Sequence, residues 1–203
     1  MGRKPVPPMT RIALSGGIAT GKSYVLERFR QRGIPCLDAD ALAHGVEAAG
    51  TEATTQIAAR FGADVLAADG SVDRRKLGPI VFADPSARRE LEAIVHPAVY
   101  RAIAAGIRGF ELTGERVVIV DVPLLFETGH EKDFDRVIVT SCPPDVQLAR
   151  LRERGMTDED ARRRLAAQWP TDKKIAGATH VIRTDGTFAE TDRQIEQIVQ
   201  QLL

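Results

Sequence analysis

The feature that most constrains this chain is the segment Gly-Gly-Ile-Ala-Thr-Gly-Lys-Ser at residues 16–23, which fits the pattern G-x-x-x-x-G-K-[ST]. The apolar residues 11–15 precede it and are typical of a buried strand. After it, apolar residues recur at helical spacing up to Gly33, where a glycine can end the helix. A strand before this pattern and a helix after it form the setting in which it binds phosphate groups. The segment therefore predicts a phosphate-binding loop.

The residue types in this loop suit the triphosphate of a nucleotide. Glycines let the main chain curl so that N–H groups face phosphate oxygens, and the following helix adds its positive end. Lys22 would reach the β- and γ-phosphates, and the Ser23 hydroxyl would bind Mg²⁺. The alternative is a glycine-rich turn with an exposed lysine. The residues expected to contact the nucleotide are Gly17, Ile18, Ala19, Thr20, Gly21, Lys22, Ser23 and Tyr24.

Four further apolar runs predict the other strands of a sheet. They lie at residues 34–37, 117–122, 137–140 and 180–182, and a last helix begins at about Phe188. The run at 117–122 is too apolar to face water on either side. Because such strands alternate with helices, the sequence predicts an α/β fold with a parallel sheet covered on both faces.

A segment of different texture separates the second and third predicted strands. It is alanine-rich, has no strand pattern, and contains Asp84-Pro85, which has the form of a helix cap followed by a first-turn proline. We expect residues 41–109 to form a helical insert between the two parts of a core, 10–40 and 110–203.

An arginine-rich helical hairpin is expected at residues 144–170. One helix stops at Gly155, and the next begins at Thr157 with a capping-box spacing. Arg150 and Arg154 are four apart and share a helix face, so they could neutralise a phosphoryl group during its transfer. The alternative is a solvated charged face, which is our interpretation of Arg162, Arg163 and Arg164.

Acidic residues follow two of the predicted strands, at the edge of the sheet where ligands of parallel sheets bind. Asp38 and Asp40 follow the second strand. Either could accept the proton of an attacking hydroxyl or orient a water on Mg²⁺, and either could instead cap the next helix. Asp121 lies at the end of the third strand and could hold Mg²⁺, the alternative being a surface acid beside a buried turn.

Charge and cysteine content restrict the class of protein. The 203 residues carry 28 Lys+Arg and 28 Asp+Glu, which disfavours a nucleic acid as the main partner. Cys36 and Cys142 are too few for a disulfide framework and favour a reducing, cytoplasmic setting. Residues 1–9 are basic and proline-rich without the apolar core of a signal peptide, so we expect a disordered leader. No apolar run is long enough to suggest a membrane span.

Together these motifs resemble the dephospho-coenzyme A kinase family. The similarity extends over nearly everything from Arg11 to Gly186. The loop motif alone is generic, whereas the aspartate pair, the His-Pro and the Pro-Leu-Leu-Phe-Glu together are specific. The matching segments are Leu14–Ser23, Asp38-Ala39-Asp40, Arg74-Arg75, Val81-Phe82, Leu91 and Ile94, His96-Pro97, Pro123–Glu127, Gln147-Leu148, Arg150, Arg154 and Ala167-Gln168.

The resemblance implies a three-layer P-loop NTPase fold, with a sheet like that of nucleoside monophosphate kinases, a helical CoA-binding insert and a mobile helical lid at 144–170. It implies ATP and Mg²⁺ as cofactors and dephospho-CoA as the substrate, phosphorylated on its ribose 3′-hydroxyl. Asp40 would be the base, and Arg154, with Lys22 and Arg150, would stabilise the transferring group. The substrate side would comprise Ser15, Asp40, His44, Arg75, His96, Pro123 and Leu124.

The chain departs from the family pattern at several positions. His44 stands where Arg is common, Gly155 replaces the usual Asp after the lid arginine, and Thr184-Asp185-Gly186 replaces a loop containing Asn. For His96, substrate contact and a role at a helix junction both stay open. A monomer or a small homo-oligomer is expected.

Two other classes of protein were weighed against this one. Another small-molecule P-loop kinase is disfavoured by the large insert. The second class is an NTP-driven switch or binding module. A guanine-nucleotide switch is disfavoured because a chain without Asn cannot supply the Asn-Lys-x-Asp motif, whereas an ATP-dependent regulator stays open as an alternative.

Overall fold

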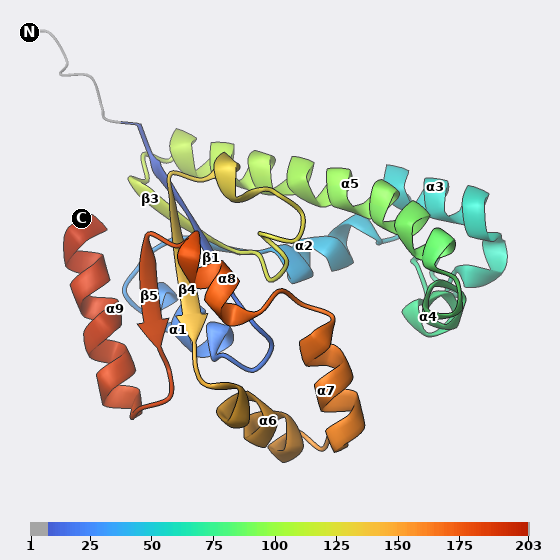
Figure 1. Ribbon diagram of the computed structural model, residues 1–203. Helices are drawn as coiled ribbons and strands as arrows, with labels where there is room; N and C mark the ends of the chain where they lie inside the picture. The colour runs from blue at the N-terminus through green and yellow to red at the C-terminus, as the bar shows by residue number, and fades with distance from the viewer. Residues whose placement is uncertain (1–7, 203) are drawn as a thin grey trace, which may run out of the picture. The chain divides into compact units, whose positions relative to one another are not determined.

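The computed structural model describes residues 8–202, and its strands form one five-stranded sheet in the order β2-β3-β1-β4-β5 (Figure 1). β1 is central and pairs in parallel with β3 and β4, and β5 pairs in parallel with β4. The predicted strands are confirmed with shifts of one or two residues at their ends. They are β1 (Thr10–Gly16), β2 (Cys36–Asp38), β3 (Val117–Asp121), β4 (Arg136–Ser141) and β5 (His180–Arg183).

The register of the sheet brings the carboxyl ends of its three central strands together. Leu14 lies opposite Asp121, and Gly16 lies opposite Thr140. The chain leaves β3 beside β1, because the N–H of Val122 donates to the Leu14 carbonyl at 2.9 Å. Residues after each of these strands therefore share one edge with the glycine-rich loop.

Helices cover both faces of the sheet, as the apolar strands predict. α1 (Lys22–Arg30) and α9 (Phe188–Leu202) bury their apolar sides against one face, in a cluster that includes Phe29, Ile119 and Ile195. α8 (Thr171–Ala176), which the sequence pattern did not predict, contacts β1 and β4, and Figure 1 shows it in front of β4 with α1 behind. A short 3-10 helix, η2 (Glu131–Asp133), precedes β4.

The predicted hairpin is present as α6 (Pro144–Glu153) and α7 (Asp158–Ala166). Thr157 is the N-cap of α7, and its hydroxyl oxygen accepts the N–H of Asp160 at 3.2 Å. Leu151 of α6 and Ala161 of α7 are fully buried in one cluster with Ala19 of the glycine-rich loop. The hairpin thus packs on the loop itself.

Contacts divide the chain into two compact units, one formed by the chain up to Leu37 and from Gly109 onward, the other by Asp38–Arg108. The second unit is helical, as expected, and has its own core of Ile57, Val65 and Leu77. Its described residues include an isolated β-bridge between Leu66 and Val72. The elements are α2 (Ala39–Val46), α3 (Glu52–Phe61), η1 (Ala63–Val65), α4 (Arg74–Ala83) and α5 (Pro85–Leu112), whose last residues belong to the first unit.

The N-terminal segment starts the sheet earlier than the predicted boundary. Residues 1–7 of the expected leader lie outside the described residues. Met9, placed in that leader, is buried, and the N–H of Thr10 donates to the Arg116 carbonyl at 2.9 Å. Among residues 8–202, no helix combines the length and apolar character needed to cross a membrane.

Candidate nucleotide-binding site

The glycine-rich loop runs from the end of β1 to the first turn of α1. Its shape depends on left-handed backbone at Ala19 (φ 60°) and at Gly21 (φ 86°), the N-cap of α1. The Thr20 hydroxyl donates to the Gly17 carbonyl at 2.7 Å and lies 2.7 Å from the Thr140 hydroxyl. A Cβ at Gly16 would overlap Thr140, so glycine is required where the loop passes β4.

The loop keeps main-chain donors available for an anion. Within residues 8–202, the N–H groups of Ala19, Gly21, Lys22 and Ser23 have no hydrogen-bond acceptor. The Lys22 ammonium likewise has no partner among the described side chains, and the Ser23 hydroxyl is exposed at the start of α1. Such N–H groups at a helix N-terminus, next to a lysine, can hold phosphate oxygens.

Asp121 occupies the position that the sequence predicts for a magnesium ligand. It is 8% exposed and lies at the carboxyl end of β3, paired with Leu14 of the neighbouring β1. Its carboxylate and the hydroxyl of Ser23 are hard oxygen donors, the type that Mg²⁺ prefers. The residues present therefore fit that ion.

A cavity of about 450 Å³ opens beside the loop and suits the base and ribose of a nucleotide. Tyr24 and the exposed Phe188 form one wall, with their ring centroids 4.8 Å apart. The Tyr24 hydroxyl donates to Asp192 at 3.0 Å, which fixes the ring at the start of α1. The remaining lining residues are Ala19, Gly21, Arg150, Arg154, Thr184, Gly186, Thr187 and Thr191.

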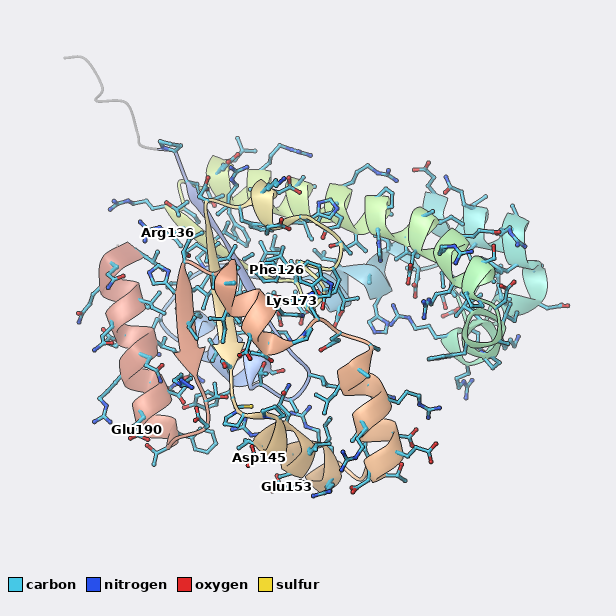
Figure 2. The ribbon with its side chains drawn as sticks, in the orientation of Figure 1. Phe126, Arg136, Asp145, Glu153, Lys173 and Glu190 are labelled. Atoms are coloured by element: carbon cyan, nitrogen blue, oxygen red, sulfur yellow. The ribbon has the colours of Figure 1, made fainter. Side chains whose placement is uncertain are left out.

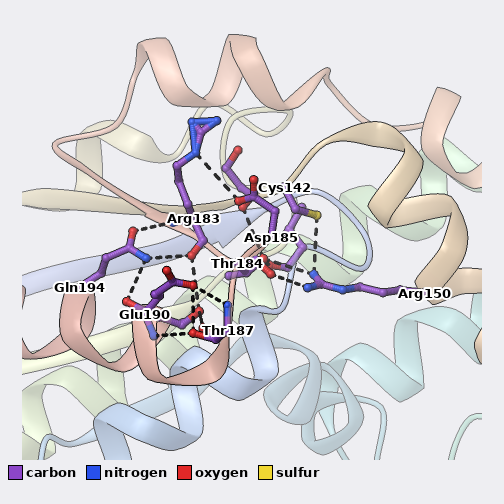
Figure 3. Close-up of polar contacts among 11 residues, drawn as sticks. Cys142, Arg150, Arg183, Thr184, Asp185, Thr187, Glu190 and Gln194 are labelled. Atoms are coloured by element: carbon purple, nitrogen blue, oxygen red, sulfur yellow. Dashed lines mark hydrogen bonds and ion pairs between the residues drawn. The ribbon is translucent and has the colours of Figure 1, made fainter.

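The two candidate arginines of α6 have different surroundings. Arg154 is exposed, lines this cavity and has no side-chain partner in the described part of the chain. Arg150 instead donates to the Ala19 carbonyl at 3.1 Å. It also donates to the Thr184 hydroxyl at 3.2 Å, as Figure 3 shows. Its guanidinium is thus bound by protein groups, whereas the sequence led us to expect that Arg150 would act on a phosphoryl group together with Arg154. Between them, Arg152 pairs with Asp158 and lowers the pKa of that carboxyl.

Polar contacts of the buried Lys174 and Ser15 hold the Pro-Leu-Leu-Phe-Glu segment, residues 123–127, in place. Lys174 of α8 is fully buried, pairs with Glu127 at 2.8 Å and donates to the Pro123 carbonyl at 3.2 Å. The buried Ser15 hydroxyl donates to the same carbonyl at 3.5 Å. Ser15 and Pro123, both expected on the substrate side, thus contact each other, whereas Leu124 is exposed.

Aromatic packing fixes the far end of the same segment. Phe126 stacks on Trp169 with ring centroids 6.4 Å apart. The Lys173 ammonium lies over the Trp169 ring, 5.5 Å from its centroid. Figure 2 labels Phe126 and Lys173. Phe126 is buried, whereas Trp169 keeps 43% of its surface exposed, so the stacked pair closes the segment at the protein surface.

The second unit separates the roles of its two aspartates. Asp38 is the N-cap of α2, and its Oδ1 accepts the N–H groups of Asp40 at 2.9 Å and Ala41 at 3.1 Å. The capping alternative is therefore confirmed for Asp38. Asp40 sits in the first turn of α2, exposed, and its carboxylate has no partner within residues 8–202.

The other candidates of this unit lie on α2, α4 and α5. His44 Nε2 is 3.1 Å from Arg74, which also pairs with Glu47 at 2.6 Å. Arg75 has 94% of its side chain exposed, and His96 is half-buried ahead of Pro97 in α5.

Some residues at the site were assigned no role by sequence reasoning. Gln147 and Gln168 both bond to Ile18, and Thr184 bonds to Thr20. The two glutamines stood among the family-like segments, but no spacing rule linked them to the loop. The role of Lys174, which donates to the Pro123 carbonyl, could not be predicted, because a single lysine in a sequence is expected at the surface.

A parallel sheet with this strand order, a phosphate loop after its central strand and a helical hairpin on that loop define a P-loop kinase. A family model described as dephospho-CoA kinase matches residues 10–190. A dephospho-CoA kinase of Geobacillus kaustophilus is 45% identical over 191 residues, which cover 94% of this chain and 95% of that protein.

Solved structures agree with the sequence comparison. The crystal structure of TT1252 from Thermus thermophilus has a TM-score of 0.82 at 31% identity, covering 96% of this chain and 98% of that one. A dephospho-CoA kinase from Campylobacter jejuni has a TM-score of 0.73 at 26% identity, covering 94% and 96%. The chain belongs to the dephospho-CoA kinase family, and the predicted family, fold and enzyme class are confirmed.

Proposed function

We propose that this chain transfers the γ-phosphoryl group of ATP to the ribose 3′-hydroxyl of dephospho-CoA, giving coenzyme A and ADP. The observation that carries the proposal is the loop after β1 in a chain of this family. Among the described residues, N–H groups of this loop lack an acceptor, and the neighbouring Lys22 lacks a partner. In phosphoryl transfer, catalysis consists mostly of positioning and charge neutralisation, and this loop supplies both.

Each candidate on the nucleotide side has a distinct task. Lys22 holds the β- and γ-phosphates, with the N–H groups of the loop around them. Arg154, whose side chain has no partner within residues 8–202 and lines the cavity, neutralises charge on the transferring group. When bound, Mg²⁺ would be held by Ser23 and Asp121 and would add positive charge at the phosphates.

On the acceptor side, Asp40 takes the proton of the ribose 3′-hydroxyl. Its carboxylate suits this role because Asp38, and not Asp40, caps α2. The exposed Arg75 and the His44–Arg74 pair supply positive charge for the phosphates of dephospho-CoA, and His96 and Leu124 complete the substrate side. We infer that the α6–α7 hairpin closes as a lid and excludes water, which would otherwise accept the phosphoryl group.

We place the enzyme in the cytoplasm, as a monomer or small homo-oligomer that acts on a small molecule and on no nucleic acid or membrane. One observation supports a reducing compartment, which is that Cys36 and Cys142 are both free. Burial raises the pKa of the Cys36 thiol to about 11, which keeps it unreactive.

A coupled assay for ADP release tests the proposed function, with dephospho-CoA, AMP, shikimate and adenosine offered separately. We expect ADP release only with dephospho-CoA, and phosphorus NMR of the product should show a new 3′-phosphomonoester. Lys22→Ala protein, prepared in parallel, controls for contaminating kinases. Activity with one of the other acceptors but not with dephospho-CoA would overturn the proposal.

A further inference from the structure

Three successive carbonyls of the phosphate loop accept hydrogen bonds from side chains. Gln147 Nε2 donates to the Ile18 carbonyl at 2.6 Å. Arg150 donates to the Ala19 carbonyl at 3.1 Å, and the Thr184 hydroxyl donates to the Thr20 carbonyl at 2.8 Å. Gln147 and Arg150 are three residues apart on α6, so that one helix face serves two of these carbonyls.

These bonds determine which way the loop's N–H groups point. In a trans peptide the C=O and the next N–H point in opposite directions. A donor on the Ile18 carbonyl therefore turns the Ala19 N–H away from α6. In the same way, the Thr184 hydroxyl on the Thr20 carbonyl turns the Gly21 N–H away from the segment after β5. Both N–H groups lack an acceptor in the described part of the chain, as an anion-binding loop requires.

Ile18 makes two hydrogen bonds to glutamine side chains, and the close approach of one of them requires glycine at position 17. The Ile18 N–H donates to Gln168 Oε1 at 2.8 Å, so that both main-chain polar groups of Ile18 bond to glutamines at the two ends of the α6–α7 hairpin. Gln147 is only 4% exposed, and a Cβ built on Gly17 would lie 2.8 Å from its Nε2. The loop and Gln147 thus fit each other closely.

We propose that Gln147 is a positioning residue for phosphate binding, acting as a hydrogen-bond donor through the Ile18 carbonyl. It touches neither nucleotide nor acceptor, and it holds the loop in the shape that presents the Ala19 N–H to a phosphate. Arg150 has the same task at Ala19, which separates it from Arg154. The inference rests on the proposed function only in requiring that the loop bind a nucleotide.

The test makes the same Gln→Glu substitution at Gln147, which donates to Ile18, and at Gln168, which accepts from it. Gln147→Glu replaces the donor by a carboxylate that the Ile18 carbonyl repels, whereas Gln168→Glu keeps an acceptor for the Ile18 N–H. Gln200→Glu on the exposed side of α9 controls for the added charge. Titration calorimetry with ADP should show affinity reduced roughly tenfold or more for Gln147→Glu, because the half-buried Ile18 carbonyl loses its donor and faces a carboxylate instead. For Gln168→Glu the loss should stay below about threefold.

Kinetics of the same full-length variants distinguish positioning from general damage to the fold. For Gln147→Glu the KM for ATP should rise while kcat at saturating ATP changes less than about threefold, because the loop holds the phosphates in ground and transition states alike. Gln147→Met, which removes the donor without adding a charge, carries the same expectation if Gln147→Glu does not fold.

Wild-type affinity for ADP in both Gln147 variants would overturn the proposal. Equal losses of affinity and of melting temperature in Gln147→Glu and Gln168→Glu would also overturn it, since added charge would then account for the effect. The calorimetry needs only ADP, so a wild-type chain that binds ADP but does not phosphorylate dephospho-CoA would contradict the proposed function and leave this inference standing.

Discussion

The two units of this chain hold their functional residues in opposite ways. In the first, the phosphate loop is fixed by side-chain donors on the carbonyls of Ile18, Ala19 and Thr20. In the second, Asp40 is exposed with no side-chain partner in the described chain, and the exposed Arg75 has only a 3.5 Å contact with Asp73. A rigid loop suits a triphosphate of constant shape, and open side chains suit a long, flexible acceptor that orders them on binding.

The largest effect we expect is on the open side, at Asp40. Asp40→Asn keeps the size of the side chain but removes the base, so kcat should fall about 10³-fold while ADP affinity is retained. Rapid-quench kinetics and ADP titration measure the two quantities. Asp38→Asn is the matched control, because Asn caps a helix as well as Asp and kcat should change less than about threefold. Unchanged turnover in Asp40→Asn would remove Asp40 from the mechanism.

The next effect concerns the rigid unit and its buried ion pair. Lys174→Met leaves Glu127, whose side chain is 14% exposed, without its cation, and the free energy of unfolding should fall by about 3 kcal/mol. Urea unfolding measures this change. The neighbouring Lys173→Met, at an exposed lysine over Trp169, should cost less than about 1 kcal/mol. Equal losses in the two variants would show that the Lys174–Glu127 pair does not set the stability of this segment.

This contrast also explains how much the sequence could predict. The strands, the loop, the Thr157 cap and the capping alternative for Asp38 are decided by neighbouring residues, and the structure confirms them. The bonds from Arg150 to Ala19, from Gln147 to Ile18 and from Lys174 to Pro123 join residues 131, 129 and 51 positions apart in the sequence. No local pattern distinguishes such an arginine or lysine from one at the surface. Arg150 and Arg154 were therefore predicted to share one role, although Arg150 bonds to the loop and Arg154 is exposed.

A smaller effect should appear in acceptor binding, where adjacent arginines differ. Arg75→Ala removes an exposed charge, so the KM for dephospho-CoA should rise roughly tenfold, the equivalent of one charge-assisted hydrogen bond, with unfolding unchanged. Arg74→Ala deprives the nearly buried Glu47 of its partner and should lower the melting temperature as well. Steady-state kinetics with thermal unfolding separates these outcomes. A KM unaffected by Arg75→Ala would place the substrate phosphates elsewhere.

The smallest effect we expect is at Ala19, where the rigid unit holds a non-glycine residue at φ 60°. Ala19→Gly relieves about 1 kcal/mol of left-handed strain, but it also adds freedom to the unfolded chain worth about as much. Stability should therefore change by less than about 0.5 kcal/mol, and the KM for ATP by less than about threefold, because hydrogen bonds to the flanking carbonyls keep the loop in shape. Urea unfolding and ATP kinetics check both values. A rise in the KM well beyond this range, with stability unchanged, would mean that the restricted backbone of alanine shapes the loop, and the side-chain donors would lose the role that distinguishes this unit from the open one.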